Sequence, residues 1–283
     1  MIDLSGKIDG GRERTIRDVA GACDALAVPF FLVGAFARDL LLELSHGLKA
    51  QRATNDVDFG IRVSGWEEFE ALKRALVGTD RYIPDPNKAQ RLIAGDGGLI
   101  DIVPFGEVED ARGRITWPPE HEIVMNALGF EEAFGHAVRV RVAGDLEVRA
   151  SSLAGLALMK LIAWDDRRFN RDAKDLRFIM THYLQAGNEE RIYGERGDHM
   201  DLLDEDKFVD VQLTGARLLG RDVGAIISDQ SHGVVTRILA EQTAEDGGHP
   251  LIAAMIGGAL DIDEAYEKAL RGLETFSLGI SDV

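Results

Sequence analysis

The chain has 283 residues, of which 45% are hydrophobic and 29% charged, enough to bury one large core or two ordinary ones. Its net charge of −17 argues against a broad nucleic-acid-binding surface, and its single cysteine, Cys23, excludes an internal disulfide and a four-cysteine zinc site. The opening stretch MIDLSGKIDG has no apolar core of a signal peptide, and no apolar run is long enough to span a membrane. We therefore expect a cytoplasmic protein.

The first half of the chain alternates between helical and strand patterns. Trp66, Phe69, Leu72 and Leu76 recur every three or four residues, which is typical of an amphipathic helix. Glycines at 95–98 separate two apolar runs and predict a hairpin turn. Helices are expected over 12–27, from Gly34 to about Leu44, and over 66–77. Strands are expected over 30–33 and 56–63, on both sides of the hairpin turn, and over 137–144 and 146–150.

The pattern changes near Ala150, after which it is mostly helical. We predict an α+β protein in which a mixed-sheet domain, 1–150, precedes a helical domain, 151–283. Residues 186–206 are polar and contain glycines, so a loop or linker is expected there.

Charge is unevenly distributed along the second half. Residues 201–283 contain 16 acidic and 6 basic side chains, whereas the segment Lys160–Arg177 contains 6 basic and 4 acidic ones. An anionic ligand is therefore expected near Lys160–Arg177 rather than at the acidic C-terminal region.

Three aspartates interrupt strands that are otherwise apolar. Val57, Phe59 and Ile61 alternate with a period of two, which places Asp56 and Asp58 together on the opposite face of one strand. Asp101 is the only charge in the apolar stretch GLIDIVPFG. If the two strands are neighbours, the three carboxylates converge, and they need a compensating charge. Mg²⁺ or Mn²⁺ is the natural candidate, because both prefer oxygen ligands. Solvated acids at strand ends are the alternative.

The stretch FLVGAFARD predicts a strand that ends at Gly34 and a helix that begins at once. Backbone N–H groups at such a helix start suit a phosphate, although strand–glycine–helix turns are common without one. Together with TNDVDF and the later Asp101, this turn resembles the nucleotidyltransferase superfamily that includes DNA polymerase beta. The resemblance implies that Gly34 and Ala35 hold a nucleoside triphosphate, and that Asp56, Asp58 and Asp101 bind the metals.

The second half resembles AbiEii-type nucleotidyltransferases, many of which are toxins of toxin–antitoxin pairs. The matching stretch is LALMKLIAWDDRRFNRDAKDL, which contains Lys160, Arg171 and Asp175. Between Ala150 and Trp164, Lys160 is the only charge, and such a lysine is rarely fully buried unless it is paired. We expect it to meet a phosphate or an acid, and we expect Asp175, on the next helix, to orient Lys160 or the acceptor. Alternatively, Lys160 reaches solvent and Asp175 pairs with Arg171.

The resemblance implies an enzyme that moves a nucleoside monophosphate from a triphosphate to an acceptor hydroxyl. Its expected catalytic groups are the three aspartates and Lys160, and its expected nucleotide ligands are Gly34, Ala35, Arg38, Lys160, Arg171 and Asp175. Arg38 and Arg52 are the weakest of these candidates, because such arginines are more often surface charges than ligands, and His121 is expected to lie at a solvated element end. Replacing Lys160 with methionine is expected to weaken nucleotide binding and to leave the fold intact.

The acceptor stays open at this point. A toxin-like enzyme would modify tRNA or a protein, and would have an antitoxin as its partner. Aminoglycoside nucleotidyltransferases share the pattern of the first half, and a cationic small molecule would suit the acidic composition. The third alternative is a non-catalytic module that binds a nucleotide or a partner.

Overall fold

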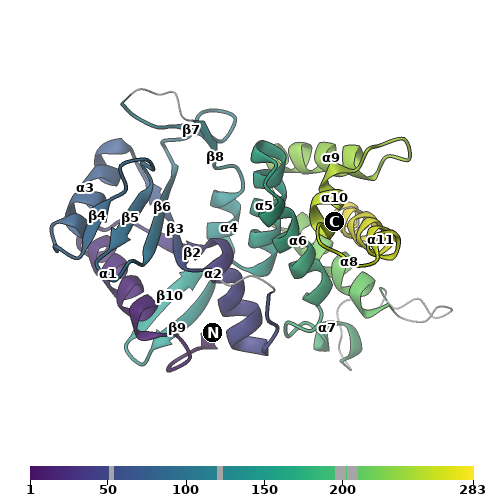
Figure 1. The fold of residues 1–283 in the computed structure, drawn as a ribbon, viewed down its shortest axis with the longest axis horizontal. Coiled ribbons are helices and arrows are strands. Elements are labelled where there is room, and N and C mark those ends of the chain that lie inside the picture. Colours follow the sequence, from purple (N-terminus) through teal and green to yellow (C-terminus); the bar gives the residue numbers. More distant parts are fainter. Residues whose placement is uncertain (51–53, 120–123, 195–201, 203–209) are drawn as a thin grey trace. The chain divides into compact units, whose positions relative to one another are not determined.

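The computed structural model describes residues 1–50, 54–119, 124–194, 202 and 210–283. Arg52, His121 and much of the expected 186–206 loop lie outside these residues. The chain divides into two compact units, Met1–Ser152 and Leu153–Val283 (Figure 1). Over the described residues, no helix combines the length and the apolar character needed to cross a membrane.

The first unit is built on a mixed sheet, as the sequence predicted. Its strand order is β1-β9-β10-β2-β3-β6-β5-β4. The central strands β3 and β6 run parallel, whereas β2 pairs antiparallel with β3 and β5 pairs antiparallel with β6. The strands of this sheet are β1 (Ile2–Asp3), β2 (Phe30–Val33), β3 (Asp56–Val63), β4 (Tyr82–Pro84), β5 (Arg91–Ala94), β6 (Leu99–Gly106), β9 (Val138–Ala143) and β10 (Leu146–Ala150). A separate antiparallel pair consists of β7 (Arg114–Thr116) and β8 (Val124–Asn126).

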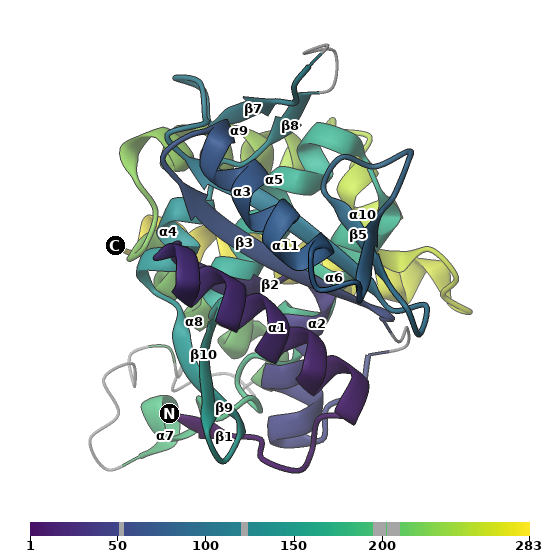
Figure 2. The same cartoon turned by 90° about the vertical axis from the view of Figure 1, so that its left-hand side faces the viewer.

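Two helices, α1 (Gly10–Leu26) and α3 (Trp66–Val77), cover one face of the sheet (Figure 2). Asp9 begins α1 by accepting a hydrogen bond from the backbone N–H of Arg12, as an N-cap aspartate does. Val57, Phe59 and Ile61 are all buried, and they alternate with Asp56 and Asp58 along β3. The apolar half of the strand pattern therefore forms core, which leaves the aspartates on the opposite face.

An aromatic cluster occupies part of the face that carries the aspartates. Phe31 contacts the rings of Phe105, Phe130 and Phe134, with ring centroids 5.7, 6.3 and 5.5 Å away. Two of these rings come from α4 (Phe130–Gly135). Gly60 makes room for the cluster, because a Cβ there would lie 2.3 Å from the Phe31 ring. The aspartates are thus placed beside a closely packed apolar layer.

The β2–α2 turn ends against the aspartate strand. Helix α2 (Gly34–Asp39) starts at Gly34, whose φ is 71°, in the left-handed region that favours glycine. A Cβ on Gly34 would lie 2.0 Å from Oδ2 of Asp58. The expected helix to Leu44 is present, but its second part is a π-helix, η1 (Leu40–Leu44), in which the Ser45 hydroxyl donates to the Leu40 carbonyl over 2.7 Å.

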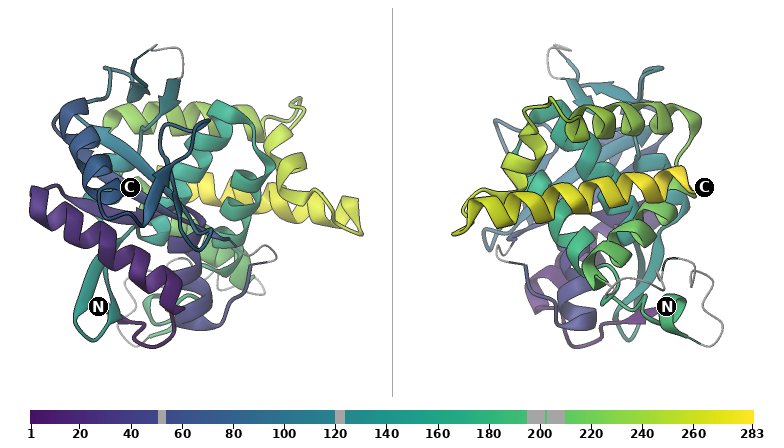
Figure 3. Two further views of the ribbon diagram at one scale, coloured as in Figure 1. Left: turned by 60° about the vertical axis from the view of Figure 1, so that its left-hand side comes forward. Right: turned by 90° about the vertical axis from the view of Figure 1, so that its right-hand side faces the viewer.

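The second unit is helical, as the sequence predicted. Helices α8 and α11 pack so closely that a Cβ on Gly220 would lie 2.2 Å from the Phe276 carbonyl oxygen, and one on Gly279 2.1 Å from that of Arg217. Figure 3 shows α11 running across this unit. The helices of the unit are α5 (Leu153–Arg167), α6 (Asn170–His182), α7 (Glu190–Tyr193), α8 (Val211–Gly224), α9 (Asp229–Thr243), α10 (Pro250–Ile256) and α11 (Ile262–Ser281).

Gly34→Ala is expected to destabilise the protein by about 1–3 kcal/mol, because alanine is strained at positive φ and its methyl group would overlap the Asp58 carboxylate. Urea unfolding followed by circular dichroism measures this change. The matched control is Gly21→Ala in α1, where a Cβ meets no atom within 4 Å and helix propensity alone predicts a gain of roughly 0.5–1 kcal/mol. If both alanines behave alike, the conformation at Gly34 carries no special constraint.

Candidate active site

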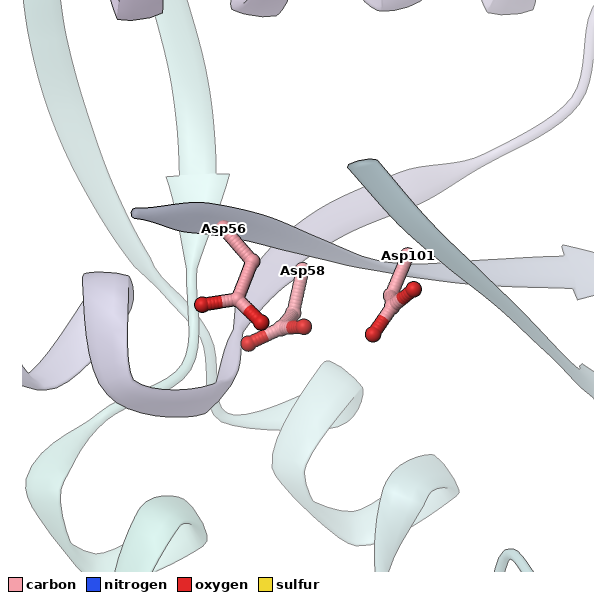
Figure 4. Close-up of side chains that lie close together, drawn as sticks. All are labelled: Asp56, Asp58 and Asp101. Atoms are coloured by element: carbon pink, nitrogen blue, oxygen red, sulfur yellow. The ribbon is translucent and has the colours of Figure 1, made fainter. Parts of the chain in front are cut away.

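Three carboxylates converge on two neighbouring strands of the first unit. In the parallel pairing of β3 and β6, Asp58 lies directly opposite Asp101, and Asp56 is two residues before Asp58. One oxygen from each of Asp56, Asp58 and Asp101 lies within 4.8 Å of the others, and all three side chains are partly buried. Figure 4 shows the three side chains pointing to the same side of the sheet. The structure therefore brings together the acids that the sequence singled out.

A residue just before β3 also holds the Asp56 side chain in place. The Thr54 hydroxyl donates to Oδ1 of Asp56 over 2.6 Å, and Thr54 is 4% exposed. The backbone carbonyl of Thr54 in turn accepts a hydrogen bond from Arg12 on α1. These contacts fix the rotamer of a carboxylate that repulsion from Asp58 would otherwise displace.

Arg91 is a member of this site that sequence reasoning missed. Its Nε and Nη2 donate to the two oxygens of Asp101 over 2.7 and 2.6 Å, and Nη2 also lies 3.4 Å from Oδ2 of Asp56. The hydrogen bond to Asp101 raises the pKa of Arg91 above its usual value, against the opposing effect of burial. The site therefore contains a permanent positive charge among its carboxylates.

The observed pairing of the hairpin explains how this arginine reaches the site. Strands β5 and β6 pair antiparallel about the glycine turn, so that Ile93 is opposite Leu99 and Arg91 is opposite Asp101. Partners across an antiparallel pair lie on the same face of the sheet. The predicted turn at 95–98 is one residue longer than the observed loop, in which the backbone N–H of Ala94 donates to the Gly98 carbonyl, and it would have placed Leu92 opposite Asp101.

The donor set fits a divalent cation. Three carboxylates bring oxygen atoms within 4.8 Å of one another, and Mg²⁺ and Mn²⁺ prefer oxygen ligands. Both oxygens of Asp101, however, accept from Arg91 in the structure. An ion that uses Asp101 must therefore share this carboxylate with a guanidinium.

The predicted phosphate-binding residues lie around the start of α2. Gly34 and Ala35 are its first two residues, and both are partly exposed. Arg38 is different, because its side chain is only 3% exposed and donates two hydrogen bonds to Oδ1 of Asp39, over 2.9 and 2.6 Å. Arg38 is therefore part of a buried ion pair rather than a surface cation.

The second unit contains its own buried charge cluster. Nζ of Lys160 lies 3.1 Å from Oδ1 of Asp172 and 2.7 Å from Oδ2 of Asp175. Asp172 has a fully buried side chain and also accepts from Nε of Arg167 over 2.7 Å. The structure thus places Lys160 next to two acids, in agreement with the expectation from the sequence. Asp175 pairs with Lys160, whereas the alternative had paired Asp175 with Arg171.

Arg171, the remaining predicted nucleotide ligand, is exposed on α6. Its guanidinium carbon lies 4.9 Å from the centroid of the Phe169 ring, and it has no ion-pair partner among the described residues. The neighbouring Arg168 is instead paired with Asp165 over 2.7 Å. Arg171 is thus the more available of these two cations.

Opposing effects act on the pKa of Asp172. Burial raises it, but the hydrogen bond from Arg167 and the charges of Lys160 and Arg167 outweigh burial and hold the pKa below its usual value of 3.8. The carboxylate is therefore ionised at neutral pH inside the helical unit. Lys160 and Arg167 are the two cations that compensate this buried charge.

Lys160→Met is expected to destabilise the helical unit by about 3 kcal/mol, because it leaves Asp172 and Asp175 buried without their shared cation. The sequence alone predicted an unaffected fold, and this measurement decides between the two expectations. Urea unfolding measures the loss. The matched control is Lys268→Met, which removes an exposed pair with Glu264 and should change stability by at most about 1 kcal/mol. Loss of triphosphate binding at unchanged stability would instead identify Lys160 as a ligand alone.

The depressed pKa of Asp172 predicts an acid-sensitive contribution to stability. A carboxyl whose pKa is lower in the folded state stabilises the protein above its unfolded pKa, near 3.8, and loses this contribution as pH falls through the folded value. Asp172→Asn removes the contribution. The free energies of unfolding of wild type and variant should therefore differ at pH 6 and converge below about pH 4. A difference that stays constant down to pH 2 would contradict this assignment.

Comparison with known proteins gives one decisive match. Residues 17–242 match the model of the family described as nucleotidyl transferase AbiEii toxin, type IV TA system. No curated protein matches the chain.

Solved structures match only loosely. ANT(2″)-Ia in complex with adenylyl-2″-tobramycin matches with a TM-score of 0.38 and 18% identity, over 64% of this chain and 92% of that one. JHP933 from Helicobacter pylori matches with a TM-score of 0.32 and 14% identity, over 96% of this chain and 93% of that one. These scores are too low to support an argument, whereas the family model covers most of the chain. The chain therefore belongs to the AbiEii family of nucleotidyltransferase toxins and is an enzyme of nucleotidyl transfer.

Proposed function

We propose that this enzyme transfers a nucleoside monophosphate from a triphosphate such as ATP to an acceptor hydroxyl, with release of pyrophosphate, and that the transfer depends on Mg²⁺ or Mn²⁺. One observation carries the proposal: Asp56, Asp58 and Asp101, from two adjacent strands, bring carboxylate oxygens within 4.8 Å of one another. Folding does not require such a cluster, because like charges at this spacing repel. A site for cations is the simplest reason for its presence.

Each aspartate has a proposed role. Asp56 and Asp58 hold the cation, with Asp56 oriented by the Thr54 hydroxyl at 2.6 Å. Asp101 shares the cation and helps to remove the proton of the acceptor hydroxyl. A divalent cation bound here lowers the pKa of that hydroxyl and offsets charge on the leaving pyrophosphate.

Phosphate binding is proposed separately for groups within each unit. The left-handed Gly34 brings the first backbone N–H groups of α2 beside Asp58, and Ala35 adds no bulky side chain. In the second unit, exposed Arg171 offers a guanidinium that no described carboxylate neutralises. Lys160 and Asp175 are proposed to take part as a fixed pair, and Arg38 to act by supporting α2 from within.

The acceptor is proposed to be an RNA or a protein, as suits a toxin. The family's description names a type IV toxin–antitoxin system, so we propose that this chain is the toxin of such a pair and that an antitoxin is its partner. A small cationic acceptor is the second candidate, favoured by the net charge of −17. Both acceptors require the same three aspartates, so one experiment addresses them together.

Asp56→Asn with Asp58→Asn is expected to abolish transfer. The protein is incubated with α-labelled nucleoside triphosphates and Mg²⁺, in parallel with bulk tRNA, a protein extract or an aminoglycoside, and label on the acceptor is measured. The variant should lose label by several orders of magnitude, because the remaining carboxylate holds a cation poorly. The same change should remove any increase of melting temperature with Mg²⁺.

The matched control is Asp24→Asn with Asp80→Asn, which removes two exposed carboxylates outside the site. It should keep transfer and the Mg²⁺ effect. Without metal, the Asp56/Asp58 variant should be at least as stable as wild type, since it relieves repulsion and retains the Arg91–Asp101 pair. If this variant unfolds without metal, the two aspartates are structural and the proposal fails. Wild-type protein that labels none of the acceptors favours a non-catalytic binding module.

A further inference from the structure

Arg91 sits where a cation would be expected. Two of its nitrogens donate to the two oxygens of Asp101 over 2.7 and 2.6 Å, and one of them lies 3.4 Å from Asp56. The side chain is only 12% exposed. Such a bidentate, charge-assisted pair is stronger than an ordinary surface ion pair, which solvent and salt weaken.

The backbone fixes this position. Arg91 and Asp101 are directly paired residues of β5 and β6. The main-chain hydrogen bonds between these strands therefore fix the position of Arg91 beside Asp101, and no flexible loop is involved. The pairing continues beyond the strand, where the backbone N–H of Ile102 donates to the Gln90 carbonyl over 2.8 Å. Arg91 therefore reaches the aspartates without any change in the sheet.

The guanidinium and a metal ion require the same acceptor. A carboxylate has two oxygens, and both oxygens of Asp101 accept from Arg91. A divalent cation at the three aspartates needs at least one of them and is also repelled by the nearby positive charge. We propose that Arg91 competes with the divalent cation for Asp101, so that binding of the ion weakens the bidentate pair. This inference rests on the metal site proposed above.

Competition has a second consequence for the metal-free protein. Three carboxylates alone would bring three negative charges together, and the guanidinium offsets one of them without a bound ion. Arg91 thus makes the site tolerable in the absence of metal and weakens metal binding at the same time. Its removal should change these two properties in opposite directions.

Mn²⁺ binding to the full chain tests the competition without any measurement of activity. Free Mn²⁺ gives a six-line electron paramagnetic resonance spectrum that is lost on binding, so a titration yields the dissociation constant. Arg91→Met keeps the apolar stem and removes the guanidinium. It should bind Mn²⁺ about tenfold more tightly than wild type, because a charge-assisted hydrogen bond to Asp101 no longer has to be broken.

Two further variants separate direct competition from a general effect of charge. Arg81→Met removes an arginine of the same unit that pairs with Asp18 over 2.7 Å, outside the three aspartates, and it should leave Mn²⁺ affinity unchanged. In an Asp101→Asn background, most of the gain from Arg91→Met should disappear, because the contested carboxylate is gone. If the Arg91→Met variant fails to fold without metal, the Arg91→Lys variant is used in its place. Its gain in Mn²⁺ affinity should be smaller, because a lysine ammonium keeps the positive charge but does not bind both oxygens of Asp101 at once.

The outcomes are distinct. Unchanged or weaker Mn²⁺ binding by Arg91→Met and Arg91→Lys, with clear binding by wild type, overturns the competition and leaves the proposed function standing. A gain that persists in full after Asp101→Asn also overturns it, because the effect is then one of charge alone. If neither wild type nor any variant binds Mn²⁺, the metal site of the proposed function fails together with this inference.

Discussion

The parallel register between β3 and β6 is the constraint on which the site depends. It places Asp58 directly opposite Asp101, and it does so through backbone hydrogen bonds that do not involve the acids themselves. The repulsion between the carboxylates is thereby overcome by the ladder and by the apolar residues on the other face, such as Val57 and Phe59. A fixed scaffold that holds unfavourable charges together is a common feature of sites kept for chemistry.

Much of this scaffold follows from local sequence patterns. The period of two in DVDFGI predicted both the strand and the face of its aspartates, because one buried face is enough to specify alternation. The amphipathic helix at 66–77 was equally clear, since its apolar residues pack on that sheet. By contrast, β1 and β7 have two and three residues. Such short strands carry no periodic pattern of their own, and tertiary pairing alone defines them.

The candidate site was predictable only in part. The acids stood out because charges in apolar strands are costly. Arg91 stands in a polar stretch, and the predicted turn at 95–98 would have placed Leu92 opposite Asp101 in its place. Of the two partners of Lys160, Asp175 was expected from the sequence, whereas Asp172 was not. Asp172 and Asp175 lie on the next helix, and sequence alone does not fix how α5 and α6 are rotated against each other. The turn of π-helix after Asp39 had no sequence pattern that we recognised.

The hairpin between β5 and β6 has a consequence for how this protein can evolve. Turns at the tips of hairpins usually tolerate gain or loss of a residue, because they lie at the surface. Here the number of residues between Arg91 and Asp101 decides which face of the sheet the arginine occupies. A single inserted residue that shifts the register by one would turn Arg91 away from Asp101 and carry its neighbours to the wrong face as well. The length of this loop therefore helps to fix where Arg91 lies relative to Asp101.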